Sequence, residues 1–320
     1  MTKKILVLHT GGTISMTADE LGHVNSSVDN PMNHVALELT DYVITSMDLF
    51  NVPSPHITEQ HMLKLYQTIK TTSGQYDGVI ITHGTDTLEE TAYFLDTLTL
   101  PNIPIVLTGA MRSANELGSD GIYNYLSALR VAGNQKARDK GVLVVMNDDI
   151  HAAKYVTKTH TTNVSTFQTP THGPLGIIMK HDILFFQSAE ARVRFDLETI
   201  KGTIPIIKAY AGMGDGILSL LRDSHIDGLV IEALGAGNLP PEAAKTLIKL
   251  AQDGLPVVLV SRCFNGIAEP VYAYQGGGVD LAANGIMFVK ELNGQKARLK
   301  LLIALSAGLT GQELKDYIEG

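Results

Sequence analysis

The chain has 320 residues, of which 44% are hydrophobic and 18% are charged. This balance is typical of a globular protein with large buried cores, and it excludes disorder over the whole chain. The formal net charge is -8, so we expect no nucleic-acid partner, which would require a basic patch.

Cysteine content and N-terminal pattern predict a compartment. The single cysteine, Cys263, excludes an intrachain disulfide, which fits a reducing environment. After Lys3 and Lys4 the apolar stretch ends at His9, and it is shorter than the ~7–15 residues of a signal-peptide core. No apolar run approaches the ~18 residues of a membrane span. We therefore expect a cytoplasmic protein with no membrane partner.

Short apolar runs alternate with helical periodicity along the chain. The runs that predict strands are residues 4–9, 79–82, 105–108, 142–146, 228–234 and 257–261. Most of them lack polar alternation, so both faces should be buried, as in a parallel sheet covered by helices. The helical stripes are residues 88–98, 126–132, 247–251 and 299–305. This alternation predicts an α/β protein with mostly parallel sheets.

The alternation breaks between Glu190 and Tyr210, where charged residues gather and Pro205 follows. We interpret this stretch as a connection between two α/β units. The expected organisation is a larger N-terminal domain over residues 1–190, a linker over 191–210 and a smaller C-terminal domain over 211–320.

The first predicted strand runs into the turn Thr10-Gly11-Gly12-Thr13. Two glycines let the backbone turn sharply and approach a ligand closely. Ligands of α/β sheets bind beyond the carboxyl ends of strands, where this turn is expected. Thr13 is therefore a candidate site residue, although such a turn by itself is usually only a turn.

The second predicted strand runs into a similar loop, residues 83–87. Thr87 and Glu90 have the spacing of a capping box, which predicts that a helix starts here. Thr85 and Asp86 would then precede a helix N-terminus, where free N–H groups and the helix dipole favour an anion such as a carboxylate. The alternative is that this Thr-Asp pair only caps the helix.

A threonine nucleophile also needs a base, because its hydroxyl is inert at neutral pH. A lysine can serve when its surroundings favour the neutral amine. Lys158 is the candidate, in the threonine-rich segment 155–162. Taken alone, a lysine of this kind is more often a solvated surface residue.

Together these residues resemble the bacterial L-asparaginase/asparaginase–glutaminase family. Residues 10–14 match one family signature and residues 83–87 match the second. The other similar segments are residues 109–112, 119–121, 142–148, 156–159 and 293–298. The resemblance therefore extends over the chain from end to end.

The resemblance implies a double displacement on L-asparagine without a cofactor or metal. Thr13 would attack the side-chain amide carbon, and water would release L-aspartate from the acyl-enzyme. Thr85, Asp86 and Lys158 would form a hydrogen-bonded group that handles protons, with Asp86 also binding the substrate α-amino group. Ser54 would hold the α-carboxylate.

The chain departs from the family pattern at two places. Family members commonly carry glutamine where Pro55 stands, and proline offers no amide donor; His56 is next to it. Many members carry a tyrosine on the loop after the first signature, whereas residues 16–30 contain none. His23 is the nearest candidate for proton exchange, although a loop histidine usually faces solvent.

A further resemblance concerns the second domain. Residues 235–239 resemble the family loop whose asparagine, here Asn238, reaches the active site of a neighbouring subunit. This implies a homo-oligomer, either a dimer or a tetramer. The accompanying glutamate of the family does not align cleanly, and Glu269 is a candidate that lies out of register.

Other enzyme classes find little support. The loop beginning Gly235-x-Gly237 has Pro240 at the third position of a dinucleotide fingerprint, and neither a His-Glu-x-x-His nor a Gly-x-Ser-x-Gly motif is present. Three alternatives remain on the same scaffold: a dual asparaginase–glutaminase, an amidotransferase-associated amidase, and a non-catalytic sensor of asparagine or aspartate. One additional methylene in a substrate is worth only ~1–3 kcal/mol, too little to be inferred from sequence.

Overall fold

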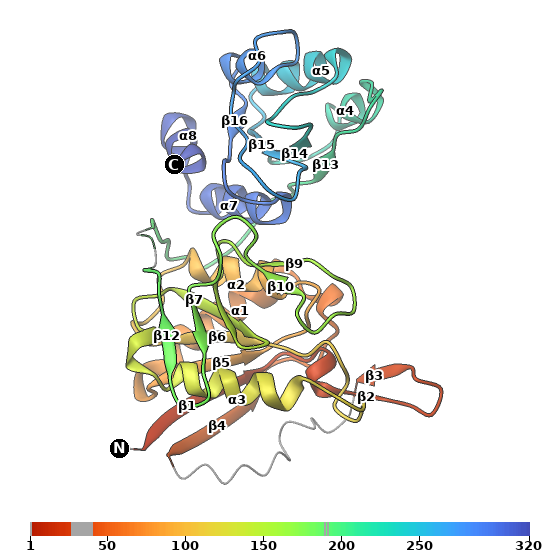
Figure 1. Cartoon of the computed structure of the whole chain (residues 1–320). Helices are drawn as coiled ribbons and strands as arrows, with labels where there is room; N and C mark the ends of the chain where they lie inside the picture. Colours follow the sequence, from red (N-terminus) through yellow and green to blue (C-terminus); the bar gives the residue numbers. More distant parts are fainter. Residues whose placement is uncertain (1, 27–40, 189, 191) are drawn as a thin grey trace. The chain divides into compact units, whose positions relative to one another are not determined.

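The computed structural model describes residues 2–26, 41–188, 190 and 192–320. The chain forms two compact units, residues 1–194 and 195–320. Each unit contains its own parallel or mostly parallel sheet and its own helices (Figure 1). The prediction of two α/β domains with mostly parallel sheets, the larger one N-terminal, is confirmed. The domain limits drawn from the sequence stay a prediction.

The first unit is built on an eight-stranded sheet with the order β12-β11-β8-β7-β6-β5-β1-β4. Strands β4, β1, β5, β6 and β7 pair in parallel, whereas β8, β11 and β12 are added by antiparallel pairing. The strands are β1 Lys3–His9, β4 Tyr42–Asp48, β5 Gly78–Thr82, β6 Ile105–Thr108, β7 Val142–Met146, β8 Asp149–Ala152, β11 Gly176–Ile178 and β12 Ile183–Phe185.

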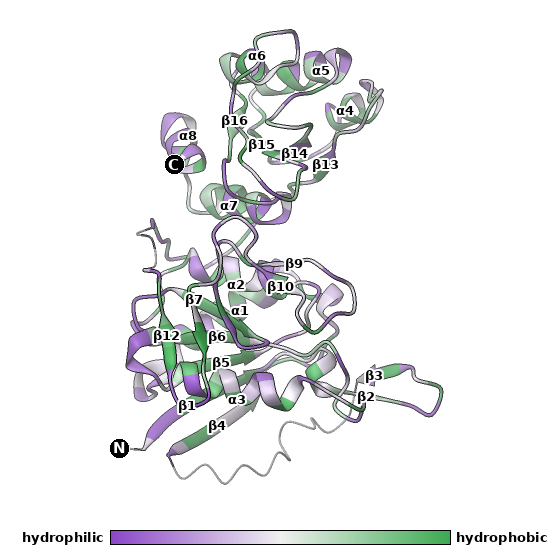
Figure 2. Ribbon diagram, viewed as in Figure 1, coloured by the Kyte–Doolittle hydropathy of each residue, from purple (hydrophilic) through white to green (hydrophobic). Residues whose placement is uncertain are grey.

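Helices cover both faces of this sheet. They are α1 Glu59–Thr72, α2 Leu88–Asp96 and α3 Gly121–Ala132. Helix α3 lies on one face, and α1 and α2 lie on the other (Figure 1). Every residue of β5 and β7 is buried, and these strands are hydrophobic along their length (Figure 2). Each fully buried Val, Leu or Ile side chain stabilises the fold by about 1.5–3 kcal/mol, so these continuous apolar runs specify the centre of the sheet.

Two small hairpins lie outside the main sheet. One pairs β2 Met16–Ala18 with β3 Val24–Ser26, and it projects from the body of the first unit (Figure 1). The other pairs β9 Thr157–Lys158 with β10 Phe167–Gln168. Residues 16–26 of the loop that follows the first signature form the first hairpin, and residues 27–30 of that loop lie outside the described residues.

The second unit contains a parallel sheet with the order β13-β14-β15-β16. The strands are β13 Ile206–Lys208, β14 Leu229–Ala233, β15 Val257–Ser261 and β16 Met287–Phe288. The helices are α4 Gly216–Leu221, α5 Pro241–Gln252, α6 Gly278–Ala283, α7 Gly294–Ser306 and α8 Gly311–Glu319. The second sheet thus begins inside the stretch that the sequence suggested as a linker. Within the described ranges, no helix is long and apolar enough to cross a membrane.

Candidate active site

The two threonine loops leave the first sheet side by side. One follows β1 and the other follows β5, and these strands pair in parallel with His9 opposite Thr82. The backbone N–H and the hydroxyl of Thr10 both donate to the Thr82 carbonyl, at 3.1 and 2.9 Å. Both loops therefore start at the carboxyl edge of parallel strands, which is where α/β proteins bind ligands.

The backbones of Gly12 and Gly84 are in contact, and these glycines directly precede Thr13 and Thr85. Gly12 has a φ of 85°, a conformation that favours glycine, and a side chain there would overlap the Gly84 backbone. A Cβ on Gly84 would in turn lie 2.7 Å from the Cβ and Oγ of Ser54. This packing gathers Thr13, Thr85 and Ser54 around one contact between loops.

The Gly12–Gly84 contact leads to a prediction about stability. Gly22 has a similar φ of 81° but nothing within 4 Å of an added Cβ, so it is a control for positive φ alone. We expect Gly22→Ala to lower the free energy of unfolding by about 1–2 kcal/mol through strain alone. Gly12→Ala should lose about 1–3 kcal/mol more, because the loops must separate and because Gly12 combines its positive φ with a ψ of 176°, a conformation nearly confined to glycine. Urea unfolding of both variants measures the difference, and equal losses would contradict the contact.

Lys158 joins the second threonine loop. Its Nζ donates to Thr85 Oγ1 at 2.9 Å and to Asp86 Oδ1 at 2.6 Å. The lysine side chain is only 15% exposed, and Thr85 is buried, whereas the Asp86 side chain is 59% exposed. The group is therefore covered on the lysine side and open to solvent at the carboxylate. Three residues that were chosen from two separate segments thus form one hydrogen-bonded cluster.

Ser54 is fastened to the same loop. Its Oγ accepts a hydrogen bond from the Asp86 backbone N–H at 3.2 Å, and its carbonyl accepts one from Thr87 Oγ1 at 2.9 Å. Helix α2 begins at Leu88, as expected, but Thr87 makes no side-chain cap. The predicted Thr87–Glu90 capping box is therefore wrong, because the hydroxyl joins the loop to Ser54 instead.

Glu89 is a residue of this site that the sequence analysis missed. It lies in the first turn of α2, and it is only 4% exposed. Its Oε1 accepts hydrogen bonds from the Lys158 backbone N–H at 3.2 Å and from Thr157 Oγ1 at 3.0 Å. The only local signal was an acidic residue in a first helical turn, which a surface residue gives equally well.

His83 is held as a neutral side chain at the start of the second loop. Its Nδ1 lies 2.8 Å from the Gly84 carbonyl and its Nε2 lies 2.9 Å from Thr91 Oγ1. A carbonyl only accepts, so Nδ1 carries the proton and Nε2 accepts from the threonine hydroxyl. Complete burial lowers the pKa of His83 to about 4. The imidazole therefore shapes the loop and does not exchange protons near neutral pH.

The residues at the two places where the chain departs from the family pattern lie at the surface. The His23 side chain is 72% exposed on the β2–β3 hairpin, and its Nδ1 lies 3.5 Å from Asp19 Oδ2. Pro55 and His56 are exposed in the short 3₁₀ helix Ser54–His56. No recorded contact joins His23 to the threonine cluster within the described part of the chain.

Asn238 and Glu269 belong to the second unit. Asn238 is half-buried, and its Oδ1 accepts from the Gly278 backbone N–H at 3.2 Å, at the start of α6. Glu269 is exposed, and its backbone N–H donates to the Ala236 carbonyl at 2.8 Å. The segment that carries Glu269 therefore lies beside the loop that carries Asn238.

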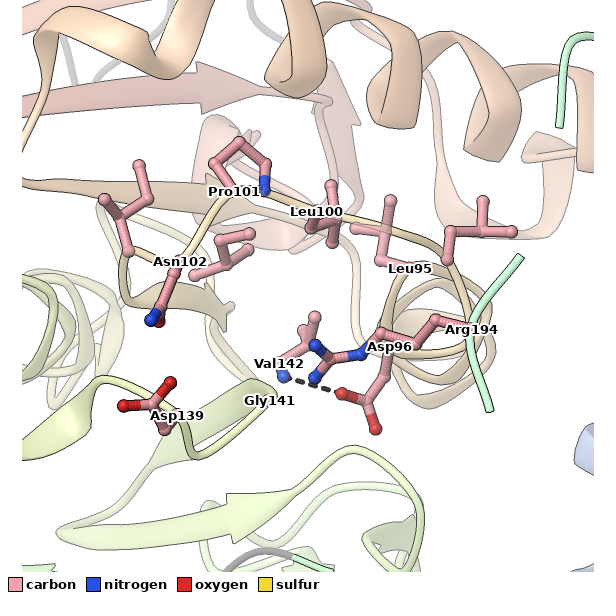
Figure 3. A pocket seen from close by; sticks show the side chains of 12 residues that line it. Leu95, Asp96, Leu100, Pro101, Asn102, Asp139, Gly141, Val142 and Arg194 are labelled. Atoms are coloured by element: carbon pink, nitrogen blue, oxygen red, sulfur yellow. Dashed lines mark hydrogen bonds between the residues drawn. The ribbon is translucent and has the colours of Figure 1, made fainter. Parts of the chain in front are cut away.

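A hollow of about 200 Å³ lies elsewhere in the first unit (Figure 3). Ile105 and Val142, the first residues of β6 and β7, line it, so it lies at the amino ends of the strands. The buried Asp96 carboxylate there accepts from the Val142 N–H at 2.8 Å and pairs with Arg192. These polar groups connect the end of α2 to the start of β7 and to the segment that follows the sheet. They lie at the amino ends of the strands, whereas the threonine loops follow the carboxyl ends.

Comparison with known proteins places the chain in a family. The model of the asparaginase N-terminal domain matches residues 4–191, and that of the glutaminase/asparaginase C-terminal domain matches residues 203–318. A probable L-asparaginase from Deinococcus radiodurans is 40% identical, covering 98% of this chain and 96% of the relative. An L-asparaginase from Bacillus licheniformis is 34% identical, covering 99% of both.

A solved structure agrees with this assignment. The crystal structure of a probable cytoplasmic L-asparaginase from Campylobacter jejuni superposes with a TM-score of 0.87 at 31% identity, and 99% of each chain is covered. Sequence relatives and fold thus agree over the whole chain, including both units. The chain belongs to the asparaginase family.

Proposed function

We propose that this enzyme hydrolyses L-asparagine to L-aspartate and ammonia, with Thr13 as the nucleophile. In this proposal Lys158, Thr85 and Asp86 form the group that handles protons. The observation that carries it is the pair of hydrogen bonds from Lys158 Nζ to Thr85 and Asp86, beside the loop that ends in Thr13. Membership of the asparaginase family supports the reaction.

Thr13 is suited to attack because a substrate can reach it. It begins the short 3₁₀ helix Thr13–Ser15 and is partly exposed, whereas the residues after it are buried. Its Oγ adds to the side-chain amide carbon, the bond from that carbon to nitrogen breaks, and the nitrogen leaves as ammonia. The proton lost by the hydroxyl is the one gained by the leaving nitrogen, and the product is an ester of Thr13 with the β-carboxyl of aspartate.

Water then cleaves this ester with the help of Lys158 and Thr85. Lys158 Nζ lies 2.9 Å from Thr85 Oγ1, so a proton can pass directly between these two groups. When the amine is neutral it accepts the Thr85 hydroxyl proton, and the Thr85 oxygen takes one from the attacking water. Asp86 stabilises the ammonium that forms at Lys158. As the ester bond breaks, this ammonium returns its proton through Thr85 to the departing Thr13 oxygen, which restores both residues.

Two neighbouring groups are suited to hold the substrate backbone. The exposed Asp86 carboxylate lies where it can pair with an α-ammonium group. The Ser54 oxygen already accepts a hydrogen bond from the Asp86 N–H, so its own proton can go to an α-carboxylate. Both anchors belong to the cluster around Thr85, which favours an amino acid over a simple amide as substrate.

Ammonia release from L-asparagine and from L-glutamine tests this function, with the Thr13→Ala variant as the blank. We expect release from asparagine that the variant lacks. Comparable release from glutamine would support the dual asparaginase–glutaminase, an alternative consistent with the family description of the C-terminal domain. Binding of L-asparagine without ammonia release by the unmodified protein would favour the sensor and overturn the proposal.

We also propose a homo-oligomer, a dimer or tetramer in which Asn238 and Glu269 contribute to a neighbouring site. Large apolar side chains are exposed in one segment of the second unit: Phe264, Ile267, Val271, Tyr272, Tyr274 and Val279. Such exposed apolar surface is typical of an interface, and sedimentation velocity measures the assembly.

The likeness to the probable cytoplasmic enzyme from Campylobacter jejuni supports a cytoplasmic location.

A further inference from the structure

We propose that Glu89 is a positioning residue that holds the Lys158 peptide in the orientation required for proton transfer. The proposal rests on the function proposed above for Lys158. Glu89 lies outside the loop that carries Thr13, and it is not one of the residues proposed to hold the substrate. It acts through Lys158, whose backbone it holds from the first turn of α2.

The start of α2 holds Lys158 at both ends. Thr85 and Asp86, in the loop before the helix, bind the side-chain Nζ at 2.9 and 2.6 Å. Glu89, in the first turn, binds the backbone N–H at 3.2 Å. A lysine side chain has a flexible stem of four carbons, so its amine can take many positions unless the side chain is held in place. Fixing both ends from one rigid segment therefore defines where the amine lies.

Thr157 completes the attachment. Its Oγ1 donates to the same Glu89 Oε1, at 3.0 Å, so one carboxylate oxygen receives two donors from consecutive residues. These two residues make up the whole of β9, which pairs only with β10 in a sheet separate from the main one. The carboxylate thus connects a small hairpin to a helix that packs on the main sheet.

Burial of Glu89 favours a specific role over a casual contact. The residue is almost completely buried, and a buried carboxylate is costly unless its hydrogen bonds are satisfied. The first turn of a helix favours a negative charge, which offsets part of that cost. An apolar residue would fill the same space without this cost, but it would leave the Lys158 N–H and the Thr157 hydroxyl without their acceptor.

The first test compares Glu89→Ala with Glu89→Gln in the full-length enzyme. We expect Glu89→Ala to lower kcat about 100-fold while KM changes less than about threefold, because only the orientation of Lys158 is lost. Glutamine keeps an oxygen acceptor at the same position, so Glu89→Gln should recover most of kcat. Equal and complete loss of activity in both variants at unchanged folding would overturn the acceptor role.

A second pair of variants keeps the test valid if Glu89→Ala does not fold. Thr157→Val removes one donor to Glu89, and Thr157→Ser keeps it. The matched control is Thr159→Val, which breaks a 2.8 Å hydroxyl bond to the Thr166 carbonyl in the same hairpin. We expect kcat to fall about tenfold only in Thr157→Val. Equal losses in Thr157→Val and Thr159→Val would mean that the hairpin alone matters, and would overturn the proposal.

The failure of this proposal is distinguishable from failure of the proposed function. If Lys158→Met is inactive while Glu89→Ala keeps a normal kcat, Lys158 retains its role and only the role of Glu89 is overturned. If Lys158→Met is fully active, both are overturned. If Lys158→Met is inactive and the Glu89 and Thr157 variants lose kcat with little change in KM, both are supported.

Discussion

Replacing Thr13 by valine is expected to lower kcat for L-asparagine by about 10⁴-fold or more, because the variant has no hydroxyl to form the acyl-enzyme. Valine keeps the branched shape of threonine, so the 3₁₀ turn that starts at this residue and the buried residues that follow should keep their places. The substrate anchors proposed at Asp86 and Ser54 are unchanged. Steady-state kinetics with continuous ammonia detection measures the loss.

Two further measurements separate a lost nucleophile from a damaged site. Thr13→Ser restores the hydroxyl and should recover at least about a tenth of kcat, since only a methyl group is missing. Isothermal titration of L-asparagine into Thr13→Val should show that binding persists. Rapid acid quench of the unmodified enzyme with substrate, followed by peptide mass spectrometry, should find a β-aspartyl adduct on Thr13. An adduct on Thr85 instead would reverse the roles of the two loops.

The fold was predictable where strands are buried on both faces. Continuous apolar runs such as β5 and β7 have no polar alternation, and each lies in the centre of the sheet. The edge strand β4 was missed, because every one of its residues is half-buried or exposed and its apolar run is only three residues long. The antiparallel strands β8, β11 and β12 were missed for a related reason, since each has only three or four residues.

For the candidate site too, residues next to predictable strand ends could be found from the sequence, whereas contacts between distant positions could not. Thr13, Thr85 and Asp86 follow strands whose ends were predictable, and parallel pairing brings such ends together. Lys158 was a candidate base because of its threonine-rich segment, and only the family resemblance favoured it over a solvated surface lysine. It lies within hydrogen-bond reach of the second loop. Glu89 could not be found, because its bond to Lys158 joins positions 69 residues apart and no local spacing encodes that contact.

The capping box shows why local patterns can mislead inside a site. Thr87 and Glu90 have the required spacing, and α2 does begin where the pattern predicts. The Thr87 hydroxyl nevertheless donates to the Ser54 carbonyl, 33 residues away in sequence. A cap would use the hydroxyl oxygen as an acceptor for a helix N–H, so the competition is for the direction of the side chain, which here reaches a distant partner. The helix boundary was therefore correct while its proposed cause was wrong.

Lys158→Met is expected to lower kcat by about 10³-fold, because the variant keeps the length of the side chain but has no group that moves a proton. The loss should not reflect unfolding. Asp86 is 59% exposed, so its carboxylate remains solvated when the ion pair is removed, and such pairs contribute only about 0–1 kcal/mol to stability. Urea unfolding of the variant checks this point.

Lys154→Met is the matched control for this variant. Lys154 lies four positions earlier and pairs with the Glu190 carboxylate at 2.9 Å, so its replacement removes a similar ion pair outside the threonine cluster. We expect Lys154→Met to retain kcat within about threefold, since the contacts it removes, with the Glu190 carboxylate and the Tyr155 ring, lie outside the threonine cluster. The contrast between the two lysines tests chemistry against net charge, because each variant loses one positive charge from the same segment. Similar kinetics in both variants would remove Lys158 from the mechanism and leave Thr13 without the proton-handling partner proposed for it.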